Sequence, residues 1–349
     1  MLGVDIRALR VIWTVFLFAL ALLMVYTIRE TLILFAVAIF FAYMLAPIVN
    51  LVERLTPKRR TLALAIVYII FVGGIVSVGI ALVSRIAEEA TSLASHLPAL
   101  LDQSRLQSLP LPSWLDRFRE NILSAIRGEA ANLQHSIVPI LQHAGGQILS
   151  GLSTLVLTVL VPILSFFFLK DARTIRDTLV DTVEGPRRSL VIQISTDIHQ
   201  LLSKYIRSLV LLSLASFVSW VIFLSLIQAP YQLLLSGIAA LLEFIPAVGP
   251  LAACVIILIV CGVSGFPGLL WIIVFWIAFR LFQDYVLNPY LMSAGVEVPP
   301  LLVLFGVLAG ERIGGIPGMF FSVPVIAIVR ILVVRLAESH RAKGVITTS

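Results

Sequence analysis

Charged residues are scarce in this chain. Asp, Glu, Lys and Arg make up only 13% of its 349 residues, whereas about 25% is usual in a soluble domain. Apolar residues make up 60% of the chain, and the mean hydropathy is +1.06. This balance excludes an ordinary soluble domain and is typical of a protein that lies largely within a lipid bilayer.

Residues that carry catalysis or bind metals are also few. Cys254 and Cys261 are the only cysteines, and their spacing of seven in an apolar run is that of packing residues on one helix face. The five histidines lack metal-ligand spacing, and neither a phosphate-binding glycine loop with Lys nor a Ser-His-Asp arrangement is recognisable. The sequence therefore predicts no enzyme, no cofactor and no metal site.

Long apolar runs, in contrast, recur along the whole chain. About 20 mostly apolar residues cross a bilayer as one helix. The sequence therefore predicts an all-α fold, a polytopic helical membrane protein with about eight spans. The runs are Val11–Ile28, Thr31–Val52, Thr61–Ser84, Ala144–Leu169, Ser208–Leu242 and Phe244–Phe279, followed by the less regular region Pro299–Val334.

The positive residues are unevenly distributed between the predicted loops. With the N-terminus inside, 17 of the 25 Lys and Arg residues fall in cytoplasmic segments and 6 in outer ones, while Arg280 and Arg312 lie at membrane depth. Because cytoplasmic loops carry the excess of Lys and Arg, both termini are predicted to be cytoplasmic. This scatter, rather than one basic surface, accounts for the net charge of +6 and argues against a nucleic-acid partner.

The apolar runs and the loops between them predict six segments. Prolines cut residues 85–143 into short amphipathic pieces, and apolar residues recur at helical spacing within residues 171–207. The segments are an N-terminal three-span unit (1–84), an extracytoplasmic amphipathic insertion (85–143), a fourth span (144–170), cytoplasmic amphipathic helices (171–207), a C-terminal transport core with broken segments (208–335) and a cytoplasmic tail (336–349).

Glu243 is the only charged residue between Ser208 and Phe279. A carboxylate at membrane depth costs about 2.5–3.5 kcal/mol on insertion scales, so it usually faces a protein interior or a water-filled cavity. Pro246, Gly249 and Pro250 follow it and break the helix, which frees backbone groups that lipid cannot satisfy. The pattern predicts a polar pocket of a transporter, and a helix-capping role for the carboxyl is the alternative.

A second break lies in the last apolar region. Two interrupted apolar segments are a good sequence indicator of a transporter's substrate site, and each can be a kinked span or a re-entrant hairpin. Upstream of this break, Arg280 and Asp284 are spaced i,i+4, so their side chains can meet as a structural ion pair or as a gate. The remaining candidate pathway residues are Asn288, which ends that helix, and Gly310, Glu311, Arg312 and Gly314 in the break.

Six motifs stand out along the chain: Tyr205-Ile206-Arg207-Ser208, Ala229-Pro230-Tyr231, Leu241–Pro250, Asp284–Pro289, Pro299-Pro300-Leu301-Leu302 and the run from Gly310 through Gly314 and Gly318 to Val323-Pro324. Together they resemble the autoinducer-2 exporter (AI-2E) family of polytopic membrane transporters. Nearly the whole chain takes part in the resemblance. Glu311-Arg312 and Ile316-Pro317 depart from the family pattern, in which a longer, mostly uncharged glycine-rich turn is expected.

The resemblance implies about eight spans, an inner-membrane location and a homo-oligomer. It also implies efflux of a small polar metabolite such as autoinducer-2, a quorum-sensing signal. One alternative is a sodium or lithium/proton antiporter, in which Glu243 or Asp284 would exchange a proton for the cation. A second is a scaffold without transport activity for the envelope or for sporulation, with Arg85–His143 as its docking surface. The expected partners are therefore the lipid bilayer and either a small polar solute or a cation.

Overall fold

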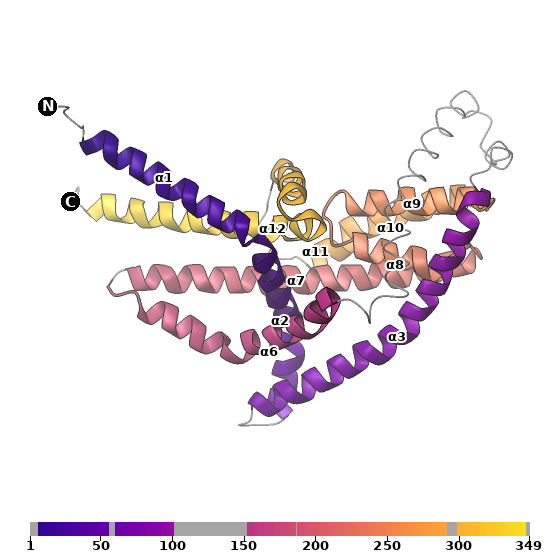
Figure 1. Cartoon of the computed structure of the whole chain (residues 1–349), viewed down its shortest axis with the longest axis horizontal. Coiled ribbons are helices and arrows are strands. Elements are labelled where there is room, and N and C mark those ends of the chain that lie inside the picture. Colours follow the sequence, from indigo (N-terminus) through magenta and orange to yellow (C-terminus); the bar gives the residue numbers. More distant parts are fainter. Residues whose placement is uncertain (1–5, 56–59, 101–151, 186, 292–298, 347–349) are drawn as a thin grey trace.

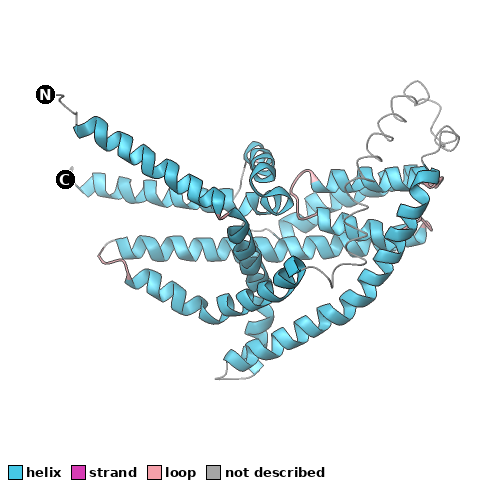
Figure 2. Cartoon of the chain, in the orientation of Figure 1, coloured by secondary structure: helices cyan, strands magenta, loops and turns pink. Residues whose placement is uncertain are grey.

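The structure is a computed structural model that describes residues 6–55, 60–100, 152–185, 187–291 and 299–346. Every regular element within these ranges is a helix (Figure 2), and five stretches there are long and apolar enough to cross a membrane. The predicted all-α, polytopic fold is thus confirmed. The elements are α1 (Ile6–Thr27), α2 (Arg29–Leu55), α3 (Arg60–Leu100), α6 (Leu152–Asp181), α7 (Arg187–Leu226), α8 (Gln232–Leu242), α9 (Gly249–Val263), α10 (Leu269–Phe282), the π-helix η2 (Gln283–Leu287), α11 (Asn288–Leu291) and α12 (Pro300–Ile346).

The N-terminal helices α2, α3 and α6 pack around one apolar cluster. Leu45 and Leu64 are almost fully buried in it. The hydroxyls of Tyr68 and Ser165 share a hydrogen bond of 2.6 Å that links α3 to α6. The described side chains of α1 are exposed, as lipid-facing side chains are in a protein whose surroundings are a bilayer.

The central helix α7 is continuous over 40 residues. It runs without a break through Arg207 and Ser208, where the predicted cytoplasmic segment meets the predicted transport core. At 1.5 Å per residue it is about 60 Å long, whereas the hydrocarbon core of a bilayer is about 30 Å thick. Trp220 and Leu224, near its C-terminal end, join the larger apolar core with residues of α8, α9 and α10.

The first predicted break is the tip of a helical hairpin formed by α8 and α9. The two helices lie side by side (Figure 1), and Gly249 packs directly against the carbonyl of Leu242, where a Cβ would collide with the backbone. α8 has 11 residues and α9 has 15, so they are about 16 and 22 Å long, too short to cross the hydrocarbon core singly. The segment is therefore a hairpin and not a kinked span.

A carboxylate from α3 caps the first helix of this hairpin. Tyr231, the N-cap residue of α8, is in the left-handed region with φ 53° and makes no side-chain cap. Instead, the backbone N–H of Leu234 donates to the Glu89 carboxylate at 2.9 Å. Free N–H groups at a helix start favour a negative partner, so Glu89 ties α3 to the hairpin.

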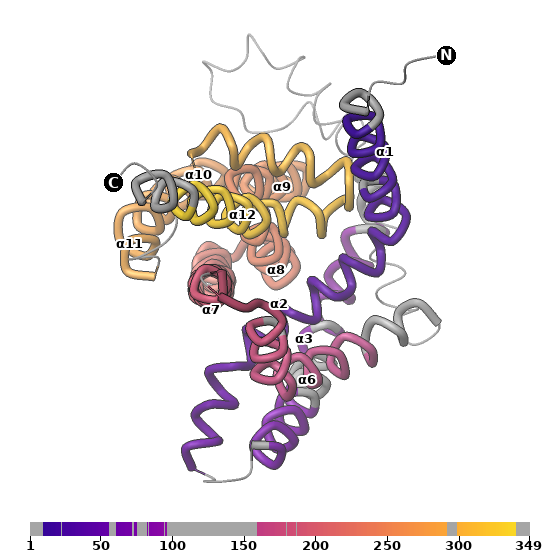
Figure 3. The backbone as a smooth tube through the Cα atoms, turned by 90° about the vertical axis from the view of Figure 1, so that its left-hand side faces the viewer, coloured from indigo at the N-terminus to yellow at the C-terminus, as the bar shows by residue number. Residues whose placement is uncertain are grey.

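The second predicted break is also a hairpin, formed within α12. Gly314 and Gly315 leave the helical region, and Gly315 has φ +60°. On either side of this turn the backbones of Gly310 and Gly318 touch, and Gly306 faces Ser322 one turn further along. Both pairs are centred on residue 314, as required for two antiparallel arms (Figure 3). The first arm, from Pro300, is about 21 Å long and so does not cross the bilayer core.

Several helix ends lie at two opposite ends of the molecule. The start of α1, the end of α12 and the turn between α6 and α7 lie at one end, whereas the end of α3 and the turn between α9 and α10 lie at the other (Figure 1). Residues 101–151, which hold most of the predicted insertion, lie outside the described ranges.

Candidate functional site

Glu243 lies at the tip of the α8–α9 hairpin and is 8% exposed. The tip places it there because α8 stops at Leu242 and α9 begins at Gly249, with Pro250 in its first turn. Its carboxylate accepts a hydrogen bond of 2.6 Å from the side-chain amide of Gln283, and the hydroxyl of Ser216 on α7 is a further partner. The buried carboxylate is thus hydrogen-bonded, as buried charges generally are.

The Glu243–Gln283 contact begins a chain of polar side chains along α10, η2 and α11. The side-chain oxygen Oε1 of Gln283 accepts a hydrogen bond of 3.2 Å from the Arg280 guanidinium. Arg280 pairs with Asp284 at 3.1 Å, and Asp284 in turn accepts a hydrogen bond of 3.1 Å from the amide of Asn288. Gln283 is 1% exposed and makes the connection between the hairpin tip and the ion pair. The result is one continuous polar chain in an otherwise apolar region.

A π-helix positions the middle of this chain. The backbone N–H of Asn288 bonds to the carbonyl of Gln283, five residues back, instead of four. Pro289 supplies a physical reason, because a proline ring in an α-helix clashes with the carbonyl four residues earlier and a wider turn relieves that clash. π-Helical turns are frequent at functional sites.

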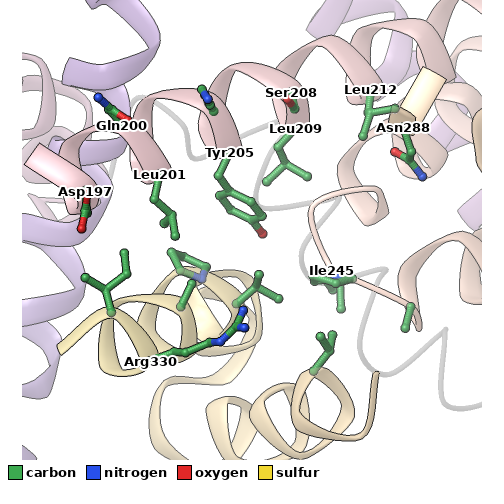
Figure 4. A pocket seen from close by; sticks show the side chains of 18 of the residues that line it. Asp197, Gln200, Leu201, Tyr205, Ser208, Leu209, Leu212, Ile245, Asn288 and Arg330 are labelled. Atoms are coloured by element: carbon green, nitrogen blue, oxygen red, sulfur yellow. The ribbon is translucent and has the colours of Figure 1, made fainter. Parts of the chain in front are cut away.

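A cavity of about 840 Å³ lies beside the polar chain, between α7, the α8–α9 tip and α12 (Figure 4). Glu243 and Arg280 lie at its wall on the hairpin side, and apolar residues form much of the rest. Its lining includes Leu201, Tyr205, Ser208, Leu209 and Leu212 of α7, Ile245, Pro246, Ala247 and Pro250 of the tip, Asn288 of α11, and Val303, Val323, Pro324, Ala327 and Ile331 of α12.

Another part of the cavity lining is charged. Arg335 of α12 forms an ion pair of 2.7 Å with Asp197 of α7 and a second of 3.1 Å with Glu338. Lys204 and Arg330 line the cavity as well. The Arg335–Asp197 pair bridges two of the helices that enclose the space, so it holds them together there.

The structure brings some of the predicted site residues together and leaves others apart. Glu243, Pro246, Pro250, Arg280 and Asn288 line the cavity. Asp284 and Gly249 do not line the cavity but contact residues that do. Asp284 pairs with Arg280, and Gly249 lies in the hairpin turn beside Ile245. The candidates from the second break lie away from the cavity lining: Gly310 in the seam of the α12 hairpin, Gly314 in its turn and the exposed pair Glu311 and Arg312 next to that turn.

Sequence reasoning missed several residues that contribute to the arrangement. Gln283 carries no charge, and its only signal was a polar amide three residues after Arg280 in an apolar helix. Asp197 and Arg335 read as ordinary cytoplasmic charges, because nothing in a linear sequence pairs residues of α7 with residues of α12. In the described ranges, no group of three or more His, Cys, Asp or Glu side chains could hold a metal ion.

Comparison with known proteins agrees with this architecture. The family described as "AI-2E family transporter" matches residues 14–338. The chain is 26% identical to the candidate transport protein YueF of Bacillus subtilis (strain 168) over 91% of both chains, and 24% identical to YrrI, named likewise, of the same organism over 87% of both. It is 27% identical to the candidate permease PerM of Escherichia coli (strain K12) over 85% of both chains. The chain therefore belongs to the AI-2E family of membrane transporters.

Proposed function

We propose that this chain is a secondary transporter of the inner membrane that exports a small polar metabolite, with autoinducer-2 as the first candidate cargo. The observation that carries the proposal is the cavity of about 840 Å³ between α7, α12 and the α8–α9 tip. Binding sites for small molecules are concave, mostly apolar and about 300–1,000 Å³ in volume, with a few convergent polar groups. Family membership supports a homo-oligomer of such units.

In this proposal Glu243 and its polar chain recognise the solute. The carboxylate lies at the cavity wall and is held by Gln283, which is itself tied to the Arg280–Asp284 pair. A solute that hydrogen-bonds Glu243 competes with Gln283. Binding in the cavity therefore changes the hydrogen bonds of the polar chain along η2 as far as Asn288. The broken helices provide the free backbone groups found at the substrate sites of many transporters.

A sodium or lithium/proton antiporter is the second candidate, because Glu243 is a buried carboxylate at a cavity wall. In that mechanism the carboxyl group exchanges a proton for the cation. Arg280 and Gln283 then act only to position it. The two functions differ in what they require of Glu243: export needs a charged hydrogen-bond acceptor there, whereas antiport needs a group that titrates.

Glu243→Gln in proteoliposomes tests both functions. Loss of trapped autoinducer-2 and a sodium-driven pH signal are followed with the same preparation. For an exporter, autoinducer-2 efflux falls by about tenfold, because a hydrogen bond to the neutral Gln amide is weaker by about 1–1.5 kcal/mol than one to the carboxylate. For an antiporter, the pH signal disappears completely, because an amide cannot titrate.

The matched control is Glu184→Gln, which changes an exposed acid in the turn between α6 and α7. It should transport as the wild type does. Folded Glu243→Gln protein with wild-type flux of every solute would remove Glu243 from the mechanism. Wild-type protein that moves neither autoinducer-2 nor cations would favour a scaffold role over transport.

A further inference from the structure

Two buried polar atoms at the cavity are left without a hydrogen-bond partner among the described residues. They are the hydroxyl of Tyr205 and the carbonyl oxygen Oδ1 of Asn288. Both residues line the cavity, and Tyr205 projects from α7 into the space between the helices (Figure 4). Buried polar groups in folded proteins nearly always have a partner, so an unpaired one is expected to meet a group that the protein does not itself supply.

The orientation of the Asn288 amide is fixed by its neighbour. A carboxylate can only accept hydrogen bonds, so the NH₂ group of Asn288 must be the part that faces Asp284. The unpaired atom is therefore an acceptor. It calls for a ligand group that donates a hydrogen bond, such as a hydroxyl, and it disfavours a carboxylate or phosphate.

One contact between helices places the two unpaired groups relative to each other. The Ser208 hydroxyl of α7 donates to the backbone carbonyl of Leu291 in α11 at 2.8 Å. Tyr205 and Asn288 each lie three residues, about one helical turn, from that contact. Both residues therefore lie near the same contact between α7 and α11 and line the same cavity, so one solute bound there can be tested for contact with each of them.

The charges of the cavity balance. Four basic residues line it, Lys204, Arg280, Arg330 and Arg335, against the acids Asp197, Glu243 and Glu338, and Asp284 neutralises Arg280 from the side. With Asp284, which does not itself line the cavity, four basic side chains are matched by four acidic ones. The region therefore has no net formal charge that would favour an ion of either sign.

We infer that Tyr205 and Asn288 form the hydrogen-bonding subsite for an uncharged, polyhydroxylated solute, with the apolar walls against its carbon skeleton. The inference rests on the proposed transport function and adds to it the class of solute and the residues that select it. The Tyr205 hydroxyl donates or accepts at one end of the solute. The Asn288 carbonyl accepts from a hydroxyl at the other.

The first test is Tyr205→Phe, measured by counterflow of labelled erythritol into proteoliposomes. Loss of the hydrogen bond should raise the half-saturation concentration about tenfold. The melting temperature of the unloaded protein in detergent should stay the same or rise, because the variant removes an unpaired buried group. Tyr285→Phe is the control: Tyr285 is 77% exposed and does not line the cavity, so both quantities should match the wild type.

The second test changes the solute. Erythritol has a hydroxyl at each end, whereas butane-1,2,3-triol lacks one terminal hydroxyl. The wild type should prefer erythritol by about tenfold, since the triol satisfies only one of the two groups. In Tyr205→Phe and in Asn288→Ala only one partner remains, so either solute can satisfy it and the preference should disappear.

The outcomes separate the inference from the function on which it rests. Erythritol transport with an unchanged preference in both variants would overturn the subsite and leave transport intact. Wild-type protein that carries lactate or ethanolamine but neither polyol would overturn the solute class. Wild-type protein that moves none of these solutes, autoinducer-2 included, would overturn the proposed function and the inference with it.

Discussion

At the scale of single residues, Gln283 is the link on which the polar chain depends. It is 1% exposed, donates to Glu243 and accepts from Arg280. Gln283→Leu keeps the volume but leaves two charged groups short of a partner. We expect a loss of about 1–3 kcal/mol of stability and reduced flux, measured as melting temperature in detergent and as transport in proteoliposomes.

The comparison variant for Gln283→Leu is Gln232→Leu. Gln232 bonds to Ser225 at the surface, so its loss should change stability by less than about 0.5 kcal/mol. Equal melting temperatures for the two variants would contradict the importance of the buried link.

Residue by residue, the sequence supported only part of the site. Glu243 and its prolines could be found because a charge and helix breakers stand out in apolar sequence. The Arg280–Asp284 contact could be found because i,i+4 spacing is local. Tyr205 and Gln283 could not, because their roles depend on which helices pack together, and an uncharged polar side chain hardly alters hydropathy.

At the scale of elements, the α12 hairpin depends on the close approach of its two arms. A Cβ on Gly310 would collide with the backbone of Gly318. Gly310→Ala should therefore push the arms apart and cost about 1–3 kcal/mol, the usual range for overpacking. Thermal unfolding in detergent measures this effect.

Gly73→Ala in α3 provides the matched change. Apart from the adjacent residues and the nearby backbone of the same helix, no described atom lies within 4 Å of a Cβ built there. The variant should therefore be neutral or slightly stabilising, since Ala favours helix over Gly. A melting temperature for Gly310→Ala equal to that of Gly73→Ala would mean that the seam is not closed in the protein.

The element boundaries show what hydropathy can and cannot provide. The apolar runs located the helical regions, and the prolines and glycines located both predicted breaks. The runs Ser208–Leu242 and Phe244–Phe279 nevertheless each contain two helices, so the runs did not give every helix end. They could not distinguish a kinked span from a hairpin, because that depends on whether the two arms touch, as Gly310 and Gly318 do. Nor did they reveal that α7 continues through Arg207, since an amphipathic stripe followed by an apolar run has no local stop signal.

At the scale of the whole molecule, we propose that the end with the α6–α7 turn and both terminal helices is cytoplasmic. The excess of Lys and Arg in those segments motivates the orientation. Single cysteines at Ser113 and Glu184 should react with impermeant thiol reagents from opposite sides of the membrane, Ser113 from outside. Ser113 lies outside the described residues, and Glu184 lies in the α6–α7 turn.

The labelling requires a background without Cys254 and Cys261, both of which are buried. Conservative replacements by Ala or Ser are the natural choice, and the wild-type transport rate checks that background. Labelling of Ser113 from the cytoplasmic side would contradict the proposed orientation.

The continuity of α7 has a mechanical consequence. One rigid helix carries Asp197, which pairs with α12, and Ser216, a partner of Glu243. The two residues are 19 positions apart, about 28 Å along the axis. A change in bilayer thickness or a bound protein that tilts the Asp197 end of α7 also displaces the Ser216 end, because the helix has no break between them. A ligand that binds α7 far from the cavity can thus change the position of Ser216 relative to the Glu243 carboxylate.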